Sequence, residues 1–219
     1  MCNLYRLRTA KAEISQIFRV EVPAGANFGE EVVKGYPGVM ITGGRAQSMN
    51  WGFPRVLRGK QGQKLAPTAV NNARSDNLAS PFWQSSFETR RCLIPVSQWA
   101  EPQGEDRRMT RTWYALPGDM PFAVGGIWRP TDMWGNCYSM VMVPASPQMQ
   151  EVHDRMPVIL RREDWDRWLG GSATQAFDLC RTWEGRLEVE RRQDRWVDGQ
   201  PLLEDEPPKL QDLPLFKDL

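Results

Sequence analysis

Residues 122–143 read FAVGGIWRPTDMWGNCYSMVMV, and this stretch decides the fold class. Its two apolar runs, Phe122 to Arg129 and Cys137 to Val143, are separated by Pro, Asp, Gly and Asn, which favour a turn between two strands. Several successive positions in each run are apolar, so both faces of each strand require cover. The stretch therefore predicts paired strands in a closed or sandwiched sheet.

Shorter segments of the same kind, and a few helical ones, flank this stretch. Further strands are expected at Val39 to Thr42, Arg111 to Leu116 and Met156 to Leu160. Short helices are expected at Ala10 to Phe18, after Ser80-Pro81 as N-cap and first helical position, and at Glu163 to Leu169 with Gly170 as the stop. Together these signals predict an α+β fold: a single domain with a β-barrel-like mixed sheet core and peripheral short helices.

The chain contains no internal repeat and no long linker, so we expect one domain over residues 1–198. Residues 199–219 mix prolines, acids and leucines, which predicts a C-terminal tail on the surface or poorly ordered. No apolar run reaches the ~18 residues of a membrane span, and the N-terminus lacks the pattern of a signal peptide. We therefore expect a cytoplasmic protein that does not bind membranes.

Charge and cysteine usage exclude several classes of function. The chain has 28 Lys and Arg against 27 Asp and Glu, so a polyanion has to be held by a local site rather than by a global field. Its four cysteines form no CxxC pair, and it has one histidine. We expect no disulfide framework, no metal site and no cofactor.

Cys2 is chemically special because of its position. Removal of Met1 would leave an α-amine and a thiol on adjacent carbons, a 1,2-aminothiol. An α-amino group has a pKa of about 7.7 to 8.0, so part of it is neutral at pH 7 and able to attack a carbonyl. The thiol can then add to the imine and close a thiazolidine ring, which makes an aldehyde the natural substrate. The alternative is an ordinary cysteine that follows the start codon without any such role.

His153 and Glu101 are candidates for proton transfer. His153 lies between a short helical segment expected from Ser146-Pro147 and the strand that ends at Leu160, and its ordinary pKa is close to neutrality. Glu101 follows an apolar run and Trp99, where partial burial would raise its pKa. A structural histidine and a solvated loop glutamate remain open alternatives.

The stretch VNNARSDN, which looks rich in turns, contains two further candidates. Asn72 could hold a backbone or substrate oxygen, and Arg74 could bind a phosphate through two parallel donors. A turn-forming asparagine and a solvated arginine are the alternatives. Tryptophans and arginines also alternate along the chain, as single-stranded nucleic acid binders require, although core tryptophans beside surface arginines give the same pattern.

In this order, Met1-Cys2, Asn72-Ala73-Arg74, RCLIP at 91–95 leading to Glu101, and HDRMP at 153–157 resemble the SRAP (SOS response-associated peptidase) family. The resemblance covers about residues 2 to 170. It implies a compact α+β fold with a positively charged groove for single-stranded DNA that contains abasic sites. We expect the protein to act as a monomer. The resemblance also implies a cytoplasmic, DNA-associated protein.

The resemblance assigns roles to the candidate residues. Cys2 would capture the ring-opened abasic sugar as a thiazolidine, Asn72 would orient the terminus and the sugar, Glu101 would move protons, and His153 would act in ring opening and reversal. The DNA-binding set would be Pro37, Trp51, Gly52, Arg74 and Arg155. The family's peptidase label implies removal of Met1, with autocatalysis as one route, and cleavage beside the lesion by β-elimination (AP lyase) would proceed through the imine.

Two other functions remain compatible with the residues. An N-terminal-nucleophile amidohydrolase or glutamine amidotransferase would also expose Cys2, with an asparagine in its oxyanion hole and a four-layer sandwich of two sheets. A non-catalytic module for single-stranded DNA would bind in a salt-sensitive way without needing Cys2.

Overall fold

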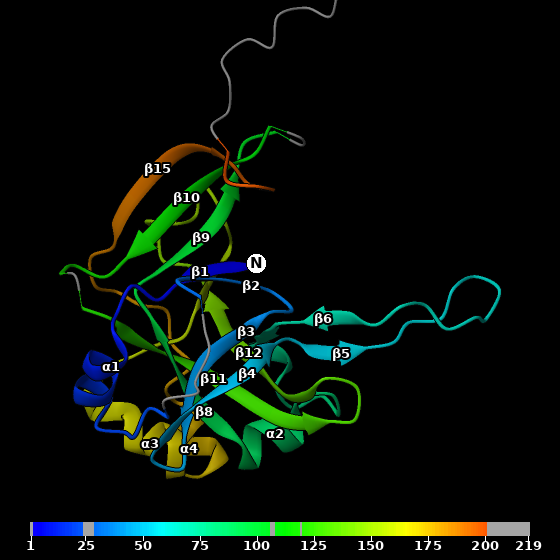
Figure 1. Cartoon of the computed structure of the whole chain (residues 1–219), viewed down its shortest axis with the longest axis horizontal. Coiled ribbons are helices and arrows are strands. Elements are labelled where there is room, and N and C mark those ends of the chain that lie inside the picture. Colours follow the sequence, from blue (N-terminus) through cyan, green and yellow to red (C-terminus); the bar gives the residue numbers. More distant parts are fainter. Residues whose placement is uncertain (1, 24–28, 106–107, 119, 201–219) are drawn as a thin grey trace, which may run out of the picture.

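The computed structural model describes residues 2–23, 29–105, 108–118 and 120–200. A β-barrel lies at its centre, a second sheet lies above it, and short helices lie below it (Figure 1). The predicted tail from Pro201 onward falls outside the described residues, and the boundary at residue 198 stays a prediction.

Five strands close the barrel. They are β3 (Pro37–Thr42), β4 (Arg45–Trp51), β8 (Arg91–Val96), β11 (Phe122–Thr131) and β12 (Gly135–Pro144). Consecutive members pair in the order β12, β4, β3, β8, β11, and β11 pairs again with β12, which closes the ring. The prediction of a closed sheet from residues 122–143 is therefore confirmed, because β11 and β12 are buried on both faces over most of their length.

Strand β12 has neighbours on both sides beyond the barrel. The strand β7 (Asn72–Arg74) continues the edge of β4 and runs parallel to β12, while β13 (Arg155–Pro157) pairs with its other edge. The single strand predicted at Met156 to Leu160 is divided into β13 and β14 (Ile159–Leu160). The division falls at Val158, whose backbone N–H donates to the Val141 carbonyl oxygen.

The second sheet has the strand order β15, β10, β9, β1, β2. Its members are β1 (Leu4–Arg6), β2 (Glu31–Val33), β9 (Gln98–Gln103), β10 (Thr110–Ala115) and β15 (Glu188–Arg195). The chain passes from barrel strand β8 to β9 through Ser97 alone, so residues that follow β8 enter this sheet directly. This barrel with an attached sheet differs from the four-layer sandwich that the amidohydrolase alternative predicts.

The helical elements are short and peripheral, as predicted. They are α1 (Lys11–Phe18), η1 (Ser75–Asn77), α2 (Gln84–Thr89), η2 (Arg162–Asp164), α3 (Trp165–Gly170) and α4 (Ala173–Phe177). Two of the expected boundaries are wrong. Ser80-Pro81 begins a turn and α2 starts only at Gln84, while α3 includes Gly170 and has Gly171 as its C-cap. The helix expected after Ser146-Pro147 is a series of turns.

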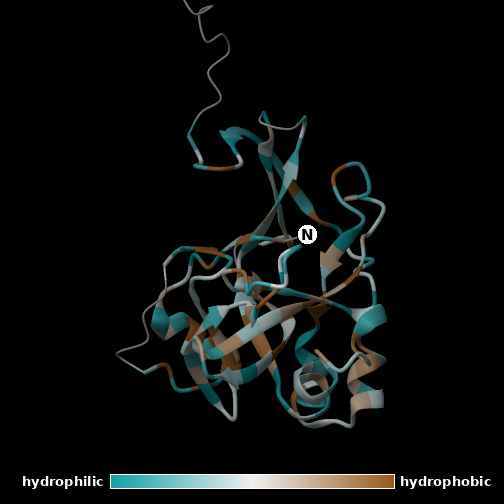
Figure 2. Cartoon of the chain, turned by 90° about the vertical axis from the view of Figure 1, so that its right-hand side faces the viewer, coloured by the Kyte–Doolittle hydropathy of each residue, from teal (hydrophilic) through white to brown (hydrophobic). Residues whose placement is uncertain are grey.

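Large aromatic side chains fill the interior. Trp51, Trp99, Trp113 and Trp168 are fully buried, and the Trp168 indole donates to the Cys92 carbonyl oxygen over 2.9 Å, which ties α3 to the barrel. Hydrophobic segments are frequent in the lower half of the molecule, whereas the upper ends of the second sheet are mainly hydrophilic (Figure 2). The main core therefore sits in the barrel and beneath it, and Trp113 forms a smaller buried cluster with Leu4 and Ala100 in the second sheet.

The strands β5 (Phe53–Arg55) and β6 (Thr68–Val70) pair with each other as a separate two-stranded sheet. With the residues that connect them they form an arm that projects from the barrel on the right of Figure 1. No helix in the described part of the chain is long and apolar enough to cross a membrane.

Candidate active site

Cys2 is held through its backbone carbonyl. The side-chain amides of Asn71 and Asn72 donate to the Cys2 carbonyl oxygen over 2.8 and 2.7 Å. The Cys2 side chain is completely buried, and its thiol lies 3.5 Å from the Leu4 carbonyl oxygen. Two amides on one carbonyl fix the position of the peptide plane, and the direction of the Cys2 backbone is fixed with it.

The two asparagines are held by the barrel. The backbone carbonyl oxygen of Asn71 accepts the Met140 backbone N–H over 2.9 Å and the Trp51 indole N–H over 3.1 Å. Asn72 begins β7, a strand parallel to β12, rather than the turn expected from VNNARSDN. Pairing with β12 overrides the local turn preference of Asn and Ser, because the β12 edge offers a complete set of backbone partners. The Cys2 carbonyl is therefore anchored to the barrel wall.

Glu101 reaches the same region from β9. Leu4 pairs with Ala100 across β1 and β9, so in this antiparallel register Glu101 lies at the Asn3 end of β1, one residue from Cys2. The side chain is completely buried, within a strand and not just beyond one as expected. Burial raises the pKa of the Glu101 carboxyl from 4.5 to about 7, which confirms the predicted direction.

The electrostatics of this region keep the thiol protonated. Burial, and after it the charge of Glu101, raises the pKa of the Cys2 thiol well above its usual value. A carboxyl with a pKa of about 7 is present in both protonation states near neutrality. The arrangement therefore offers a neutral thiol beside a group that can give or take a proton.

His153 lies in the segment between β12 and β13. Its Nδ1 accepts the Arg155 backbone N–H over 2.9 Å and lies 3.2 Å from a carboxylate oxygen of Asp154. Burial lowers the pKa of His153, which favours the neutral ring. In the neutral ring, Nδ1 accepts the hydrogen bond from the Arg155 backbone N–H, so the ring proton is assigned to Nε2. The negative charge of Asp154, next to His153 in the same segment, also helps to raise the pKa of the Glu101 carboxyl.

Arg74 and Arg155 meet at one carboxylate. Arg74 donates through Nε and Nη2 to the two oxygens of Asp76 over 3.0 and 2.5 Å, and Arg155 donates to the same group over 3.3 Å. Strands β7 and β13 bring them together, because Arg74 pairs with Met142 and Arg155 with Pro144 of β12. Two guanidinium groups thus lie side by side at the edge of the region that contains Asn72.

The other predicted DNA-binding residues have different positions. Trp51 is fully buried, and a direct contact between its ring and DNA would require it to become exposed. Gly52 is also buried, with a φ of 128°, and a Cβ there would lie 2.6 Å from that of Ala69. Pro37 is exposed at the start of β3. In this structure Trp51 acts on the site indirectly, through Asn71.

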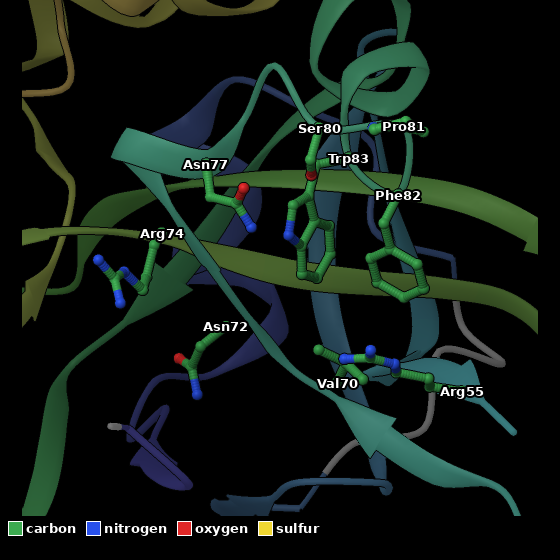
Figure 3. Close-up of a pocket in the computed structure, with 9 residues that line it drawn as sticks. All are labelled: Arg55, Val70, Asn72, Arg74, Asn77, Ser80, Pro81, Phe82 and Trp83. Atoms are coloured by element: carbon green, nitrogen blue, oxygen red, sulfur yellow. The ribbon is translucent and has the colours of Figure 1, made fainter. Parts of the chain in front are cut away.

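A cavity of about 490 Å³ adjoins Asn72. Asn72 and Arg74 form one side of it, Phe82 and Trp83 the other, and Arg55 from the arm lies below the two rings (Figure 3). Asn72 is thus placed between the anchored Cys2 carbonyl and an open space with both aromatic and cationic walls.

Sequence reasoning missed two residues of this region. Asn71 binds the Cys2 carbonyl as closely as Asn72 does, and the Asn-Asn pair was the available signal. Asp76 joins Arg74 to Arg155, but the long-range half of this contact leaves no pattern in the sequence. Within the described residues, no cluster of three or more His, Cys, Asp or Glu side chains could hold a metal ion.

Comparison with known proteins relates this chain to a family and to several individual proteins. The family described as SOS response associated peptidase (SRAP) matches residues 1–193. The abasic site processing protein YobE of Bacillus subtilis is 29% identical over 138 residues, which span 59% of this chain and 61% of YobE. YoqW, also an abasic site processing protein of Bacillus subtilis, is 28% identical over 138 residues, 59% of each chain.

Solved structures show the same fold. A protein of Bordetella bronchiseptica superposes with a TM-score of 0.74 at 20% identity, covering 87% of this chain and 99% of its own. A protein of Bacteroides thetaiotaomicron gives a TM-score of 0.72 at 16% identity, covering 88% of this chain and 93% of its own. The barrel with its attached sheet therefore recurs in proteins with little sequence identity to this one.

Proposed function

Because this chain belongs to the SRAP family, we propose that it processes abasic sites in single-stranded DNA by capturing the ring-opened sugar on Cys2. Relatives that are themselves named abasic site processing proteins support this substrate. The single observation that carries the proposal is the double hydrogen bond from Asn71 and Asn72 to the Cys2 carbonyl, with buried Glu101 one register position away.

The first step is hydrolysis of the Met1–Cys2 peptide bond. One water is consumed, methionine leaves, and Cys2 gains a free α-amine. Two routes are open, a cellular aminopeptidase and the chain's own site. The second has support here, because two amides fix the Cys2 carbonyl and a carboxyl with a pKa of about 7 lies one register position from Cys2.

The second step joins the sugar to Cys2. The neutral α-amine attacks the C1 aldehyde of the open sugar, and the resulting carbinolamine loses water to give an imine. The thiol sulfur then adds to the imine carbon, its proton passes to the ring nitrogen, and a thiazolidine results. The raised pKa of the thiol fits this order, because a protonated thiol leaves the first attack to the amine.

Glu101 and His153 would move the protons. Glu101 would protonate the departing hydroxyl of the carbinolamine, take up the N–H proton as the imine forms, and relay the thiol proton to the ring nitrogen on closure, tasks suited to a carboxyl with a pKa of about 7. His153, neutral with its proton on Nε2, would act on the sugar ring oxygen during opening and closing. β-Elimination from the imine would break the C3–O bond beside the lesion, and thiazolidine closure competes with it.

Arg74 and Arg155 would hold the phosphates next to the abasic sugar. Their guanidinium groups lie together around Asp76, and Arg74 also borders the cavity beside Asn72. A phosphate accepts the parallel donors of such groups. The near-neutral chain would thus hold a polyanion locally.

The test is covalent adduct formation with an abasic single strand. Wild-type protein is expected to give a heat-stable adduct whose mass equals the chain without Met1, plus the oligonucleotide, minus one water. Cys2→Ala, which still permits removal of Met1, is expected to give none. Cys137→Ala is the matched control, because Cys137 is an equally buried cysteine within the barrel strand β12.

A heat-stable adduct formed by Cys2→Ala at the wild-type rate would refute the proposal. Peptide mapping of the wild-type adduct has to place the added mass on the N-terminal peptide. An adduct on a lysine elsewhere would refute thiazolidine formation at Cys2, even if the protein still recognised the abasic site.

A further inference from the structure

The charge of the chain is distributed unevenly around the arm. Residues 32–75 contain seven Lys or Arg and no Asp or Glu, although the whole chain has a formal charge of only +1. Four of the seven cations lie on the arm: Arg55, Arg58, Lys60 and Lys64. Among the described residues none of these four forms an ion pair, whereas Arg74 and Arg155 both do.

Backbone pairing joins the two halves of the arm, and a hydrogen bond to the barrel anchors its base. Phe53 pairs with Val70 and Arg55 with Thr68, and a further bridge joins Arg58 to Lys64 near the turn. At the base, Gly52 donates its N–H to the Tyr138 carbonyl oxygen over 2.8 Å. The close approach of Gly52 to Ala69 described above leaves no room for a side chain there. The four cations are therefore presented on a defined framework.

Aliphatic side chains accompany the charges. Val56, Leu57 and Leu65 are 41%, 43% and 44% exposed on the arm. Exposed apolar groups between cations that have no ion-pair partner in the described part of the chain suit a ligand that is anionic along one edge and apolar along another. A single DNA strand has this character, with phosphates on one side and sugars and bases on the other.

The arm is continuous with the candidate site. Arg55, at the end of β5, lines the cavity that Asn72 and Arg74 border, and Val70 links β6 through Asn71 to β7 (Figure 3). The turn at the end of the arm begins at Gly59, four residues beyond Arg55, a distance of roughly 13 Å at about 3.3 Å per residue. That length lets the arm lie alongside a few phosphates of a single strand.

We propose that the arm formed by residues 53–70 is a second DNA-binding element, which holds the phosphates of the strand that leaves the abasic nucleotide past Arg55. The inference rests on the proposed function for the path of the strand. It adds that affinity depends on the length of undamaged DNA beside the lesion and on Arg58, Lys60 and Lys64.

The test is equilibrium binding of the full chain to single strands with a tetrahydrofuran abasic analogue, which has no aldehyde and cannot be captured. Arg58→Gln, Lys60→Gln and Lys64→Gln are combined, and Arg55 is left intact because it lines the cavity. On a strand of about 20 nucleotides, three lost phosphate contacts at ~0.7 each lower the slope of log K against log [salt] by about 2. This corresponds to about 100-fold weaker binding at about 0.1 M salt, with convergence near 1 M.

A matched control removes three cations from elsewhere on the surface. Arg162, Arg181 and Arg186 are exposed, and they lie on η2 and between α4 and β15, outside the arm. Their combined change to Gln is expected to alter the slope by less than about 0.5, because only long-range screening is affected. Equal melting temperatures of the three proteins are required to exclude unfolding.

Strand length gives the second readout. With about 6 nucleotides centred on the lesion, too few to follow the arm, the difference between wild type and arm variant is expected to fall below threefold. Equal slopes for wild type and arm variant on the long strand would overturn the proposal, and this is also the result expected if the arm contacts an acidic protein instead. Wild type that binds these strands but never crosslinks to a true abasic site would refute the proposed function alone, and absence of any binding would refute both.

Discussion

Glu101→Gln is expected to change how stability depends on pH. The carboxyl has a pKa of about 7 in the fold against an ordinary value of 4.5, and burial is the main cause. The folded chain therefore binds this proton more tightly than the unfolded chain, so Glu101 lowers stability progressively as pH rises from about 4.5 through 7. At about 1.4 kcal/mol for each pKa unit, the full effect is about 3 kcal/mol.

The glutamine variant cannot ionise and removes this dependence. Between about pH 5 and 8, the difference in unfolding free energy between Glu101→Gln and wild type is expected to move by about 2 to 3 kcal/mol in favour of the variant. Any constant cost of placing an amide in the site cancels in this comparison. His153 titrates in both proteins, so its opposite contribution largely cancels as well.

The assay is urea unfolding at several pH values, followed by tryptophan fluorescence. Glu105→Gln is the matched control, because Glu105 is exposed in the loop after β9, four residues from Glu101. Its stability is expected to stay parallel to wild type across the range. If the stability of Glu101→Gln also ran parallel to wild type, the buried carboxyl would have an ordinary pKa. The proposal that Glu101 transfers protons near neutral pH would then be refuted.

Three further changes test the site and its support. Asn72→Ala is expected to slow adduct formation about 10- to 100-fold in quenched time courses, because one hydrogen bond to the Cys2 carbonyl is lost. Asp76→Asn is expected to tighten binding to undamaged single strands and raise the salt slope by about 0.7 in anisotropy titrations, since it frees the donors of two guanidinium groups. Gly38→Ala is expected to cost about 2 to 3 kcal/mol in thermal unfolding, because its Cβ would lie 2.1 and 2.2 Å from two buried tyrosine hydroxyls.

Each of these has an opposite outcome. An unchanged adduct rate for Asn72→Ala would leave Asn71 as the only anchor of consequence. Weaker DNA binding by Asp76→Asn would mean that the carboxylate positions the two guanidinium groups rather than competing with phosphate. Wild-type stability of Gly38→Ala would contradict the close packing at the hydroxyl pair of Tyr5 and Tyr138, which are 2.7 Å apart.

The barrel was largely predictable because its strands carry their own signal. Strands such as β11 and β12 are apolar on both faces and are bounded by turn residues. In the second sheet only β10 gave such a signal, and it corresponds to the strand predicted at Arg111 to Leu116. β15 reads EVERRQDR and is almost entirely polar, and β9 reads QWAEPQ with a proline and an acid. These strands form because a neighbouring strand supplies their backbone partners, which no local pattern records.

The candidate site follows the same division. Cys2 and His153 were found from chemistry that belongs to single residues, a terminal aminothiol and an imidazole. Glu101 was expected to be partly buried, but its place inside a strand depends on pairing with β1 and β10. Asn71 and Asp76 act through contacts with residues up to 79 positions away, so only the fold reveals them.

The cost of burying Glu101 is itself an argument about the site. A carboxyl that loses about 3 kcal/mol of stability on ionisation is an expensive choice for packing alone, since an apolar side chain in β9 avoids the loss. Its neighbour Ala100 and nearby Trp99 show that this strand buries apolar side chains readily. The fold places this one acid where β1 brings the N-terminal residues, and two side-chain amides anchor the Cys2 carbonyl in the same region. A buried acid beside an anchored Cys2 is explained if Glu101 has to exchange a proton near neutral pH during chemistry at Cys2. The pH dependence of stability in Glu101→Gln measures how much folding free energy the ionised carboxyl costs.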